Sequence, residues 1–307
     1  MDRDDAVTED LEQRTRRVFD AHHREQADDP LIYGRLVSLI SPEYFQLPPD
    51  WFEGKHVLDV GCGSNANASK AFLELGAAHV RSVDLGTGWM DVAGAELAAY
   101  GSRSSLADEN VTMLSIEDGA YDFVHCAGVL HHTSDPRLGH SELVRVAKPG
   151  GYVFATVMAN AKGLLYQFFN LLRDQYKRDE DFRATIDGLS ADGTSEALDW
   201  LFSEKAKREP SLPEEERVLR SLFDADLVLT IKDRIQAPTY HDFDFTEEQI
   251  RGWFADAGCQ DVVRLSRYTY GFGNLRRFLA PMYLEYSHPL ARLWFGEGYV
   301  QMIGRKP

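Results

Sequence analysis

A short apolar run that ends in two glycines constrains the fold of this 307-residue chain more than any other feature. The run is Val57–Gly63, with the sequence VLDVGCG, and its apolar residues predict a short buried strand. Gly61 and Gly63 allow the backbone to turn tightly and to approach a ligand without an intervening Cβ atom. A helix predicted over 66–75 follows, and its first amide groups present positive dipole to an anionic group. The segment therefore predicts a strand–turn–helix unit that binds a ligand.

Strands and helices continue to alternate after this unit. Further strands are predicted over 80–83, 121–126, 152–157, 261–265 and 299–303, and helices over 90–100, 138–147 and 246–257. Such alternation implies an α/β fold built on a doubly wound, mostly parallel sheet. Ligands bind such sheets at the carboxyl ends of the strands, which is where Gly61 lies.

The same pattern divides the chain into four parts. Residues 1–54 are predicted to carry N-terminal helices over 8–27 and 30–39, the first of them a charged surface helix, in a position to act as a lid. Residues 55–160 form the ligand-binding core, 161–237 a helical insertion that forms a cap, and 238–307 a C-terminal helix and strands that complete the sheet. Helices are predicted over 163–176 and 214–229, with charged, glycine-containing linkers between them, and over the aromatic-rich stretch 275–294.

Composition limits the partners and the compartment. The formal net charge is -16, from 33 basic and 49 acidic residues. A surface this negative repels phosphate backbones and anionic lipid heads, so neither nucleic acid nor a membrane is expected as a partner. No unbroken run of roughly 18 apolar residues is present, and the acidic N-terminus has no apolar signal core. Cys62, Cys126 and Cys259 fit neither a metal site nor a disulfide framework, so a cytoplasmic protein without a bound metal is expected.

Two acidic residues at strand ends narrow the class of ligand. Asp59 precedes the glycine turn, where a carboxylate can meet an ammonium group directly or through water, and Asp84 follows the next strand, where it can accept both hydroxyls of a ribose. The spacing of Gly61, Gly63 and Ala66 also satisfies the loose dinucleotide fingerprint, so a nicotinamide-dependent oxidoreductase stays open as an alternative. Asp59 has no role against a pyrophosphate, and it therefore favours a cofactor that carries an amino acid.

Residues 55–160 resemble the class I, Rossmann-like S-adenosylmethionine-dependent methyltransferases, in the branch that includes ubiquinone- and menaquinone-biosynthesis enzymes. The resemblance rests on DVGCG at 59–63, VLHH at 129–132 and KPGG at 148–151, in that order. It implies a seven-stranded sheet and S-adenosylmethionine as the cofactor. It also implies a set of cofactor contacts: Asp59, Gly61, Cys62 and Gly63 around the methionine portion, Asp84 and Leu85 on the ribose, Asn110 and Val111 at the adenine, and the backbone of Cys126 and Ala127.

Two positions depart from the family's pattern. Asn65 stands where the family's turn has a third glycine, and a side chain there narrows the pocket or adds a polar contact. Asn110 stands where an aspartate is common, and its amide can still donate to and accept from the adenine edge. Asp108 and Glu109 are close enough in sequence to leave the register of this contact open.

Candidate catalytic residues follow the fourth strand and precede the last helix. Methyl transfer depends mainly on positioning, and it needs a base only when the acceptor carries a proton to lose. The candidates for such a base are His131, His132, Tyr240 and His241, although capping or packing is the favoured interpretation of the first pair. The candidates for substrate binding are Tyr33, Arg35, Arg234, Tyr240, His241 and Tyr268. The alternatives for these residues are purely structural: packing on the surface, a place in a polar loop, or a place in the hydrophobic core.

These features favour a methyltransferase that acts on an oxygen, nitrogen or sulfur atom of a small molecule bound beneath the cap. An amino acid or another carboxylate-bearing metabolite, such as a thioether amino acid, is compatible with the absence of a convincing base. A non-catalytic S-adenosylmethionine-binding sensor or structural subunit is the second hypothesis, and the nicotinamide-dependent oxidoreductase is the third. Assembly as a homodimer is left open.

Overall fold

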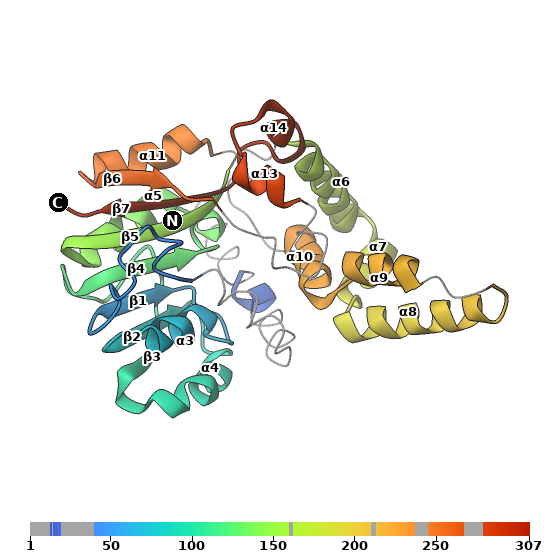
Figure 1. The fold of residues 1–307 in the computed structure, drawn as a ribbon, viewed down its shortest axis with the longest axis horizontal. Coiled ribbons are helices and arrows are strands. Elements are labelled where there is room, and N and C mark those ends of the chain that lie inside the picture. The colour runs from blue at the N-terminus through green and yellow to red at the C-terminus, as the bar shows by residue number, and fades with distance from the viewer. Residues whose placement is uncertain are drawn as a thin grey trace, which may run out of the picture.

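A seven-stranded sheet forms the centre of the molecule (Figure 1). The computed structural model describes residues 13, 15–19, 40–159, 162–209, 213–236, 245–266 and 279–307. The strand order is β3-β2-β1-β4-β5-β7-β6, in which β1 to β5 pair in parallel and β7 runs antiparallel to both of its neighbours. The strands are β1 (His56–Val60), β2 (His79–Asp84), β3 (Ser104–Asp108), β4 (Tyr121–Ala127), β5 (Ala147–Ala159), β6 (Gln260–Arg264) and β7 (Gly298–Arg305). The predicted seven-stranded, mostly parallel sheet is confirmed.

Helices pack on both faces of the sheet and bury a separate apolar layer on each. On one face, α3 (Asn67–Glu74) and α4 (Met90–Leu97) cover a layer that includes Phe45, Phe52 and Phe72. On the other, α5 (Pro136–Val146) and α11 (Glu247–Asp256) cover a layer that includes Leu143 and Phe254. Burial on both faces explains why β1 and β4 read as nearly continuous apolar runs rather than as alternating ones.

A second group of helices lies beyond the end of the sheet, on the right of Figure 1. The group consists of α6 (Leu164–Arg178), α7 (Glu180–Asp187), α8 (Ala191–Ala206), α9 (Pro213–Leu222) and α10 (Ala225–Gln236), followed later in the chain by α13 (Ala280–Leu284) and α14 (Pro289–Phe295). Helix α10 packs against α6 and α8, and α14 packs against α6. None of the helices that the structure describes is long and apolar enough to cross a membrane.

Several predicted elements differ from the structure, mostly in this helical group. Helices α7 and α8 lie where charged linkers were predicted, and the helix predicted over 214–229 is two helices that break at residues 223–224. Strand β3 was not predicted, because it is an edge strand whose residues are at most partly buried and include no β-branched side chain. The predicted helix over 90–100 ends at Leu97 and continues as the 3-10 helix η1 (Ala98–Arg103).

Strand register brings the ends of the central strands together. Val60 of β1 pairs with Val83 of β2 on one side and with Cys126 of β4 on the other. Parallel strands that stop in register open their following loops at the same edge. The glycine turn after β1, the acidic residue at the end of β2 and the loop after β4 therefore meet at one place.

Candidate functional site

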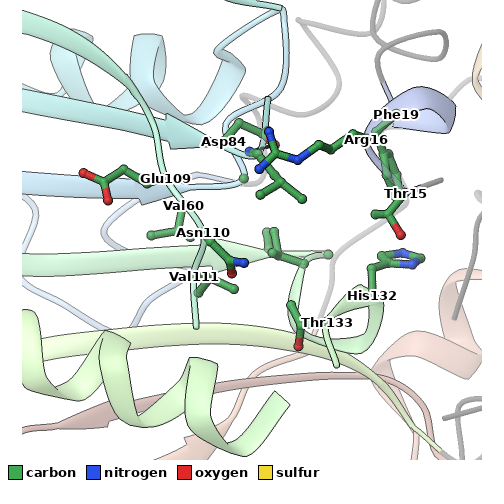
Figure 2. Close-up of a pocket in the computed structure, with 15 residues that line it drawn as sticks. Thr15, Arg16, Phe19, Val60, Asp84, Glu109, Asn110, Val111, His132 and Thr133 are labelled. Carbon is green, nitrogen blue, oxygen red and sulfur yellow. Dashed lines mark hydrogen bonds between the residues drawn. The ribbon is translucent and has the colours of Figure 1, made fainter. Parts of the chain in front are cut away.

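A pocket opens at this meeting point, between the strand ends and the N-terminal segment 15–19 (Figure 2). The loops after β1, β2, β3 and β4 each contribute part of its wall. The lining residues are Thr15, Arg16, Phe19, Val60, Gly61, Asp84, Leu85, Glu109, Asn110, Val111, Ala127, Gly128, Val129, His132 and Thr133. Six of the ten residues expected to contact a cofactor are among them: Gly61, Asp84, Leu85, Asn110, Val111 and Ala127.

The glycine turn brings bare backbone to the pocket surface. Gly61 has φ of 74°, in the left-handed region that favours glycine, and its amide donates to the carbonyl oxygen of Val83 at 2.8 Å. A Cβ atom at Gly61 would lie 2.0 Å from the Cγ2 atom of Val129. Gly128 on the facing loop also has a positive φ, of 81°. Glycine is therefore required at Gly61 both for the backbone conformation and for the close approach of Val129.

Asp84 ties the glycine turn to the end of β2. Its Oδ2 atom accepts the amide of Gly63 at 2.8 Å, and its Oδ1 atom accepts the amide of Leu85 at 2.7 Å. An ionised carboxylate has about four lone-pair sites, and Asp84 also lines the pocket. The predicted contact of Asp84 with ribose hydroxyls is compatible with this arrangement and stays a prediction.

The loop after β3 presents an amide group to the pocket. The Oδ1 atom of Asn110 accepts from both the backbone amide and the hydroxyl of Thr112, at 2.9 and 2.8 Å. These two donors orient the side chain, so its NH2 group is the part available to a ligand. Glu109 is held by Arg81 at 2.7 Å and by Ser115 at 2.6 Å, and it points away from Asn110 in Figure 2. The geometry favours Asn110 over Glu109 as the polar contact for an adenine.

Asp59 lies behind the pocket rather than on its surface. It is 1% exposed, and its carboxylate contacts the Nδ1 atom of His125 at 2.8 Å and the hydroxyl of Ser69 at 2.6 Å. Both carboxylate oxygens therefore have partners inside the protein. The predicted direct contact of Asp59 with an ammonium group has no support in this arrangement, because the pocket lining begins at the next residue, Val60.

The two cysteines of the predicted site are neutral thiols outside the pocket lining. Burial, followed by the charges of Asp84 and Asp59, raises the pKa of Cys62 well above its ordinary value. Burial, followed by the same two carboxylates, also raises the pKa of Cys126. A thiolate is the reactive form of cysteine, so neither side chain serves as a nucleophile. Gly63, likewise outside the lining, acts through its amide on Asp84.

The two adjacent histidines occupy different environments. His132 lines the pocket, and its ring contacts the ring of Phe19 edge-on at 4.9 Å. His131 is 3% exposed, and its Nδ1 atom accepts the backbone amide of Met158 at 3.3 Å. Burial, then the charges of His132 and Arg234, lowers the pKa of His131 well below its usual range. Of the two candidate bases, only His132 can meet a ligand in this pocket.

The N-terminal segment 15–19 closes one side of the pocket, an arrangement compatible with the lid predicted for residues 1–54, which stays a prediction. Thr15, Arg16 and Phe19 project into the pocket from one helical turn (Figure 2). Arg16 also forms an ion pair with Asp108, the last residue of β3, at 3.6 Å. The only sequence signal was that Thr15 and Phe19 are four residues apart and so share a helix face. Within residues 1–54, the ligand contacts predicted from the sequence were Tyr33 and Arg35, and none of these three residues was among them.

Five predicted residues lie outside the part of the chain that the structure describes. They are Tyr33, Arg35, Tyr240, His241 and Tyr268, and their assigned roles stay predictions. Arg234 lies on α10 and does not line the pocket. Within the described ranges, no group of three or more His, Cys, Asp or Glu side chains is placed to hold a metal ion.

Comparison with known proteins identifies the family that the sheet-forming core resembles. Residues 58–155 match the model of the family described as a methyltransferase domain. The chain contains a class I S-adenosylmethionine methyltransferase domain. A ubiquinone biosynthesis O-methyltransferase from Nitrosospira multiformis is 37% identical to it over 115 residues, which cover 37% of this chain and 47% of that protein. One from Coxiella burnetii is 32% identical over 127 residues, which cover 39% and 53%.

The sequence alignments with the curated relatives cover less than two fifths of this chain. The chain spans about half the length of the curated relatives it matches. Among solved structures, a putative methyltransferase from Bacillus halodurans has a TM-score of 0.46 at 14% identity, covering 86% of this chain and 97% of that one. A SAM-dependent methyltransferase from Methanosarcina mazei has a TM-score of 0.45 at 16% identity, covering 83% and 93%. These two are distant likenesses.

S-adenosylmethionine is the cofactor of this domain, and the pocket has the chemical groups that the molecule requires. The amide NH2 of Asn110 can donate to the ring nitrogens of adenine, and Val111 supplies an apolar contact beside it. Asp84 places a carboxylate, which accepts hydrogen bonds from hydroxyl groups, in the pocket lining. Gly61 and Gly128 expose backbone where a side chain would fill the space. The residues present therefore fit a nucleoside joined to an amino acid.

Proposed function

We propose that this chain is an S-adenosylmethionine-dependent methyltransferase that methylates an oxygen, nitrogen or sulfur atom of a small-molecule acceptor. One observation carries the proposal. The pocket extends from Asp84 and Asn110, which suit a nucleoside, past Gly61 to a separate end lined by His132 and Phe19 (Figure 2). A cofactor bound along the strand ends would leave that second end for the acceptor.

The residues at the acceptor end determine how the reaction proceeds. Bound S-adenosylmethionine supplies an electrophilic methyl group on a sulfonium. The protein has to hold the acceptor atom in line with that group, and positioning of this kind can supply about 7–11 kcal/mol of the barrier reduction. Val129 and Phe19 form apolar walls that exclude water from this end. His132 is placed to take the proton that a hydroxyl or ammonium acceptor has to lose.

An oxygen atom is the first candidate for the methylated position. Curated relatives that are 32–37% identical over the domain are named as O-methyltransferases. A hydroxyl acceptor needs a base, and His132 lies on the pocket surface. The neutral ring of His131 lies behind His132, and the two ring centres are 4.2 Å apart. Both observations support a hydroxyl acceptor over a thioether, which has no proton to lose.

The cap and the partners belong to the same proposal. Helix α10 brings Arg234 against Met158 of β5, so the helical group over 161–237 reaches the strand that borders the site. This contact supports the group as a cap over the acceptor. The formal charge of the protein, -16, disfavours nucleic acid and membranes, so the proposed partner is a small molecule. The proposal also includes a cytoplasmic location, and it leaves assembly as a homodimer open.

Methyl transfer from labelled cofactor tests this function directly. The protein is incubated with radiolabelled S-adenosylmethionine and a panel of phenols, amines, thiols and thioethers, and labelled products are counted. We expect transfer to at least one phenol. His132→Gln should lower kcat by about a hundredfold, in the range of general-base catalysis, without changing the affinity for S-adenosylhomocysteine. His56→Gln, at the exposed start of β1, is the matched control and should leave kcat unchanged.

Binding without transfer would change the assignment. Tight binding of S-adenosylhomocysteine with no product from any acceptor class would favour the sensor or structural subunit. Transfer that is unaffected by His132→Gln would keep the methyltransferase and reject the base.

A further inference from the structure

Arg234 lies in the last turn of α10, where the cap meets the sheet. Its Cζ atom lies over the ring of Tyr166 on α6, 5.7 Å from the centre, and over the ring of Tyr299 on β7, at 6.0 Å. Its Nη1 atom donates to the sulfur of Met158 on β5. Arg173 of α6 donates to the carbonyl oxygen of Arg234 at 2.9 Å and fixes the end of α10. The guanidinium is therefore held in one place by core and cap together.

No carboxylate neutralises Arg234 within the described part of the chain. Arg145, Arg220 and Arg264, by contrast, each contact one or two carboxylates. A guanidinium offers five N–H donors, and the thioether of Met158 is only a weak acceptor. A half-buried cation without a counter-ion is costly, and the chain has 49 acidic residues from which a partner could have come. The unmatched charge points to an anion from outside the chain.

Arg234 is connected to the acceptor end of the pocket through two aromatic contacts. The hydroxyl of Tyr299 lies 2.8 Å from the position of a Cβ atom at Gly128, which lines the pocket. The ring of Tyr299 also lies 5.9 Å from the ring of His131, which is next to His132. The charge of Arg234 contributes to the lowered pKa of His131, after burial and His132. Arg234 therefore adjoins Tyr299, whose hydroxyl lies beside Gly128 at the edge of the pocket.

We propose that Arg234, flanked by Tyr166 and Tyr299, recognises a carboxylate group of the methyl acceptor. The inference rests on the proposed methyltransferase function and narrows its acceptor to small organic acids. Cation–π contacts with the two tyrosine rings do not use the N–H groups of the guanidinium, so those other than the one donated to Met158 can serve a ligand. A planar carboxylate matches this fork through two parallel hydrogen bonds. The bound acid would supply the negative charge that the described part of the chain does not place there.

Matched acids and amides test this subsite without knowledge of the natural acceptor. The protein is first saturated with S-adenosylhomocysteine, and calorimetry then measures the binding of acetate, benzoate and phenylacetate against acetamide, benzamide and phenylacetamide. We expect at least one acid to bind about tenfold or more tightly than its amide, because a charged hydrogen bond is lost in the amide. Arg234→Gln should abolish the preference, and Arg234→Lys should keep part of it, since the charge remains without the fork.

Arg220→Gln provides the matched control. Arg220 is on the cap helix α9, is paired with Asp199 and Glu216, and lies outside the subsite, so the preference for the acid should be unchanged. No preference for any acid in the native protein, or a preference that survives Arg234→Gln, would overturn the subsite alone. Failure of S-adenosylhomocysteine to bind in the first step would instead reject the proposed function.

Discussion

Two buried histidines of the methyltransferase domain differ in what surrounds their ring nitrogens. The Nδ1 atom of His125 lies 2.8 Å from the carboxylate of Asp59, and its ring stacks on Phe154. His140, on α5, is fully buried against the ring of Phe254 at 4.3 Å, and neither of its nitrogens has a hydrogen-bond partner within the described structure. A buried polar group is tolerated at low cost only when it is hydrogen-bonded. Removal of the two rings should therefore have opposite effects.

For His140, the expected effect is a pH dependence of stability that becomes smaller on substitution. Burial lowers the pKa of His140 from 6.5 to about 4, so between these values the unfolded chain binds a proton that the folded protein does not. His140 alone should lower the free energy of unfolding by about 2 kcal/mol as the pH falls from 7 to 5. His140→Leu should remove this share of the loss, while the share from the buried His131, whose pKa is also lowered, remains. The substitution should also raise the stability at pH 7 by about 1–2 kcal/mol.

Urea unfolding at pH 7 and pH 5 measures both effects. His56→Leu replaces an exposed histidine at the start of β1 and should keep the native pH dependence. If His140→Leu were as sensitive to acid as the native protein, another group would have to be responsible for the loss.

For His125, the expected effect is a loss of both stability and cofactor affinity. His125→Leu leaves the carboxylate of Asp59 with Ser69 as its remaining side-chain contact, and breaking a buried pair of this kind costs about 3–5 kcal/mol. Because Asp59 lies two residues before the glycine turn, the dissociation constant for S-adenosylhomocysteine should also rise. His125→Asn can still donate to Asp59 and should restore part of both quantities, as followed by urea unfolding and calorimetry. Equal behaviour of the two variants would argue against a role for the hydrogen bond.

At the scale of whole elements, the sequence predicted the core far better than the cap. The strands β1 and β4 and the helix α11 follow from apolar runs, from the glycine turn and from the capping box that Thr246 and Gln249 form. Helix α8 has a glycine at 193 and exposes Trp200, so its pattern resembled a linker. The pairing of Asp59 with His125 could not be predicted either, because it depends on the register of β1 against β4, which no local pattern encodes.

The turn between β1 and α3 offers a matched test of why a glycine is needed. Gly61 and Gly54 both have positive φ, of 74° and 71°, but only Gly61 has a close neighbour, the Cγ2 atom of Val129. Gly54→Ala should cost about 1–2 kcal/mol of stability from the left-handed conformation alone and leave cofactor affinity unchanged. Gly61→Ala should cost more and should weaken S-adenosylhomocysteine binding by at least about tenfold, a factor equivalent to about 1.4 kcal/mol.

A second substitution separates the clash from the backbone strain. Gly61→Ala combined with Val129→Ala removes the Cγ2 atom and should recover part of the affinity measured by calorimetry. If the double variant bound no better than Gly61→Ala, the contact with Val129 would not be the reason for the glycine.

At the scale of the whole molecule, the acceptor end of the pocket combines segments that are far apart in the sequence. Phe19, from the N-terminal segment, contacts His132, which follows β4. Arg234, from the cap, contacts Tyr299 of β7. The match to the methyltransferase family model covers residues 58–155, which include His132 but neither Phe19 nor Arg234 nor Tyr299.

Phe19→Ala should separate the two ends of the pocket. The ring of Phe19 forms part of the wall beside His132. Its loss should therefore raise the KM for the acceptor several-fold. The affinity for S-adenosylhomocysteine should change by less than about twofold, which is less than the loss of a buried contact would cause. Arg17→Ala alters an exposed side chain of the same helical turn and should leave both constants unchanged. Steady-state kinetics and calorimetry together measure the difference. An equal loss of cofactor affinity and acceptor KM would place Phe19 over the cofactor instead.

The most direct test of the central claim is calorimetric titration of the native protein with S-adenosylhomocysteine and, separately, with NAD. We expect one binding site for S-adenosylhomocysteine and no measurable heat with NAD. Asp84→Ala should abolish the binding, because it removes the carboxylate that joins the glycine turn to the end of β2 and faces the pocket. Binding of NAD in place of S-adenosylhomocysteine, or binding of S-adenosylhomocysteine that Asp84→Ala leaves intact, would contradict the assignment of this pocket to S-adenosylmethionine.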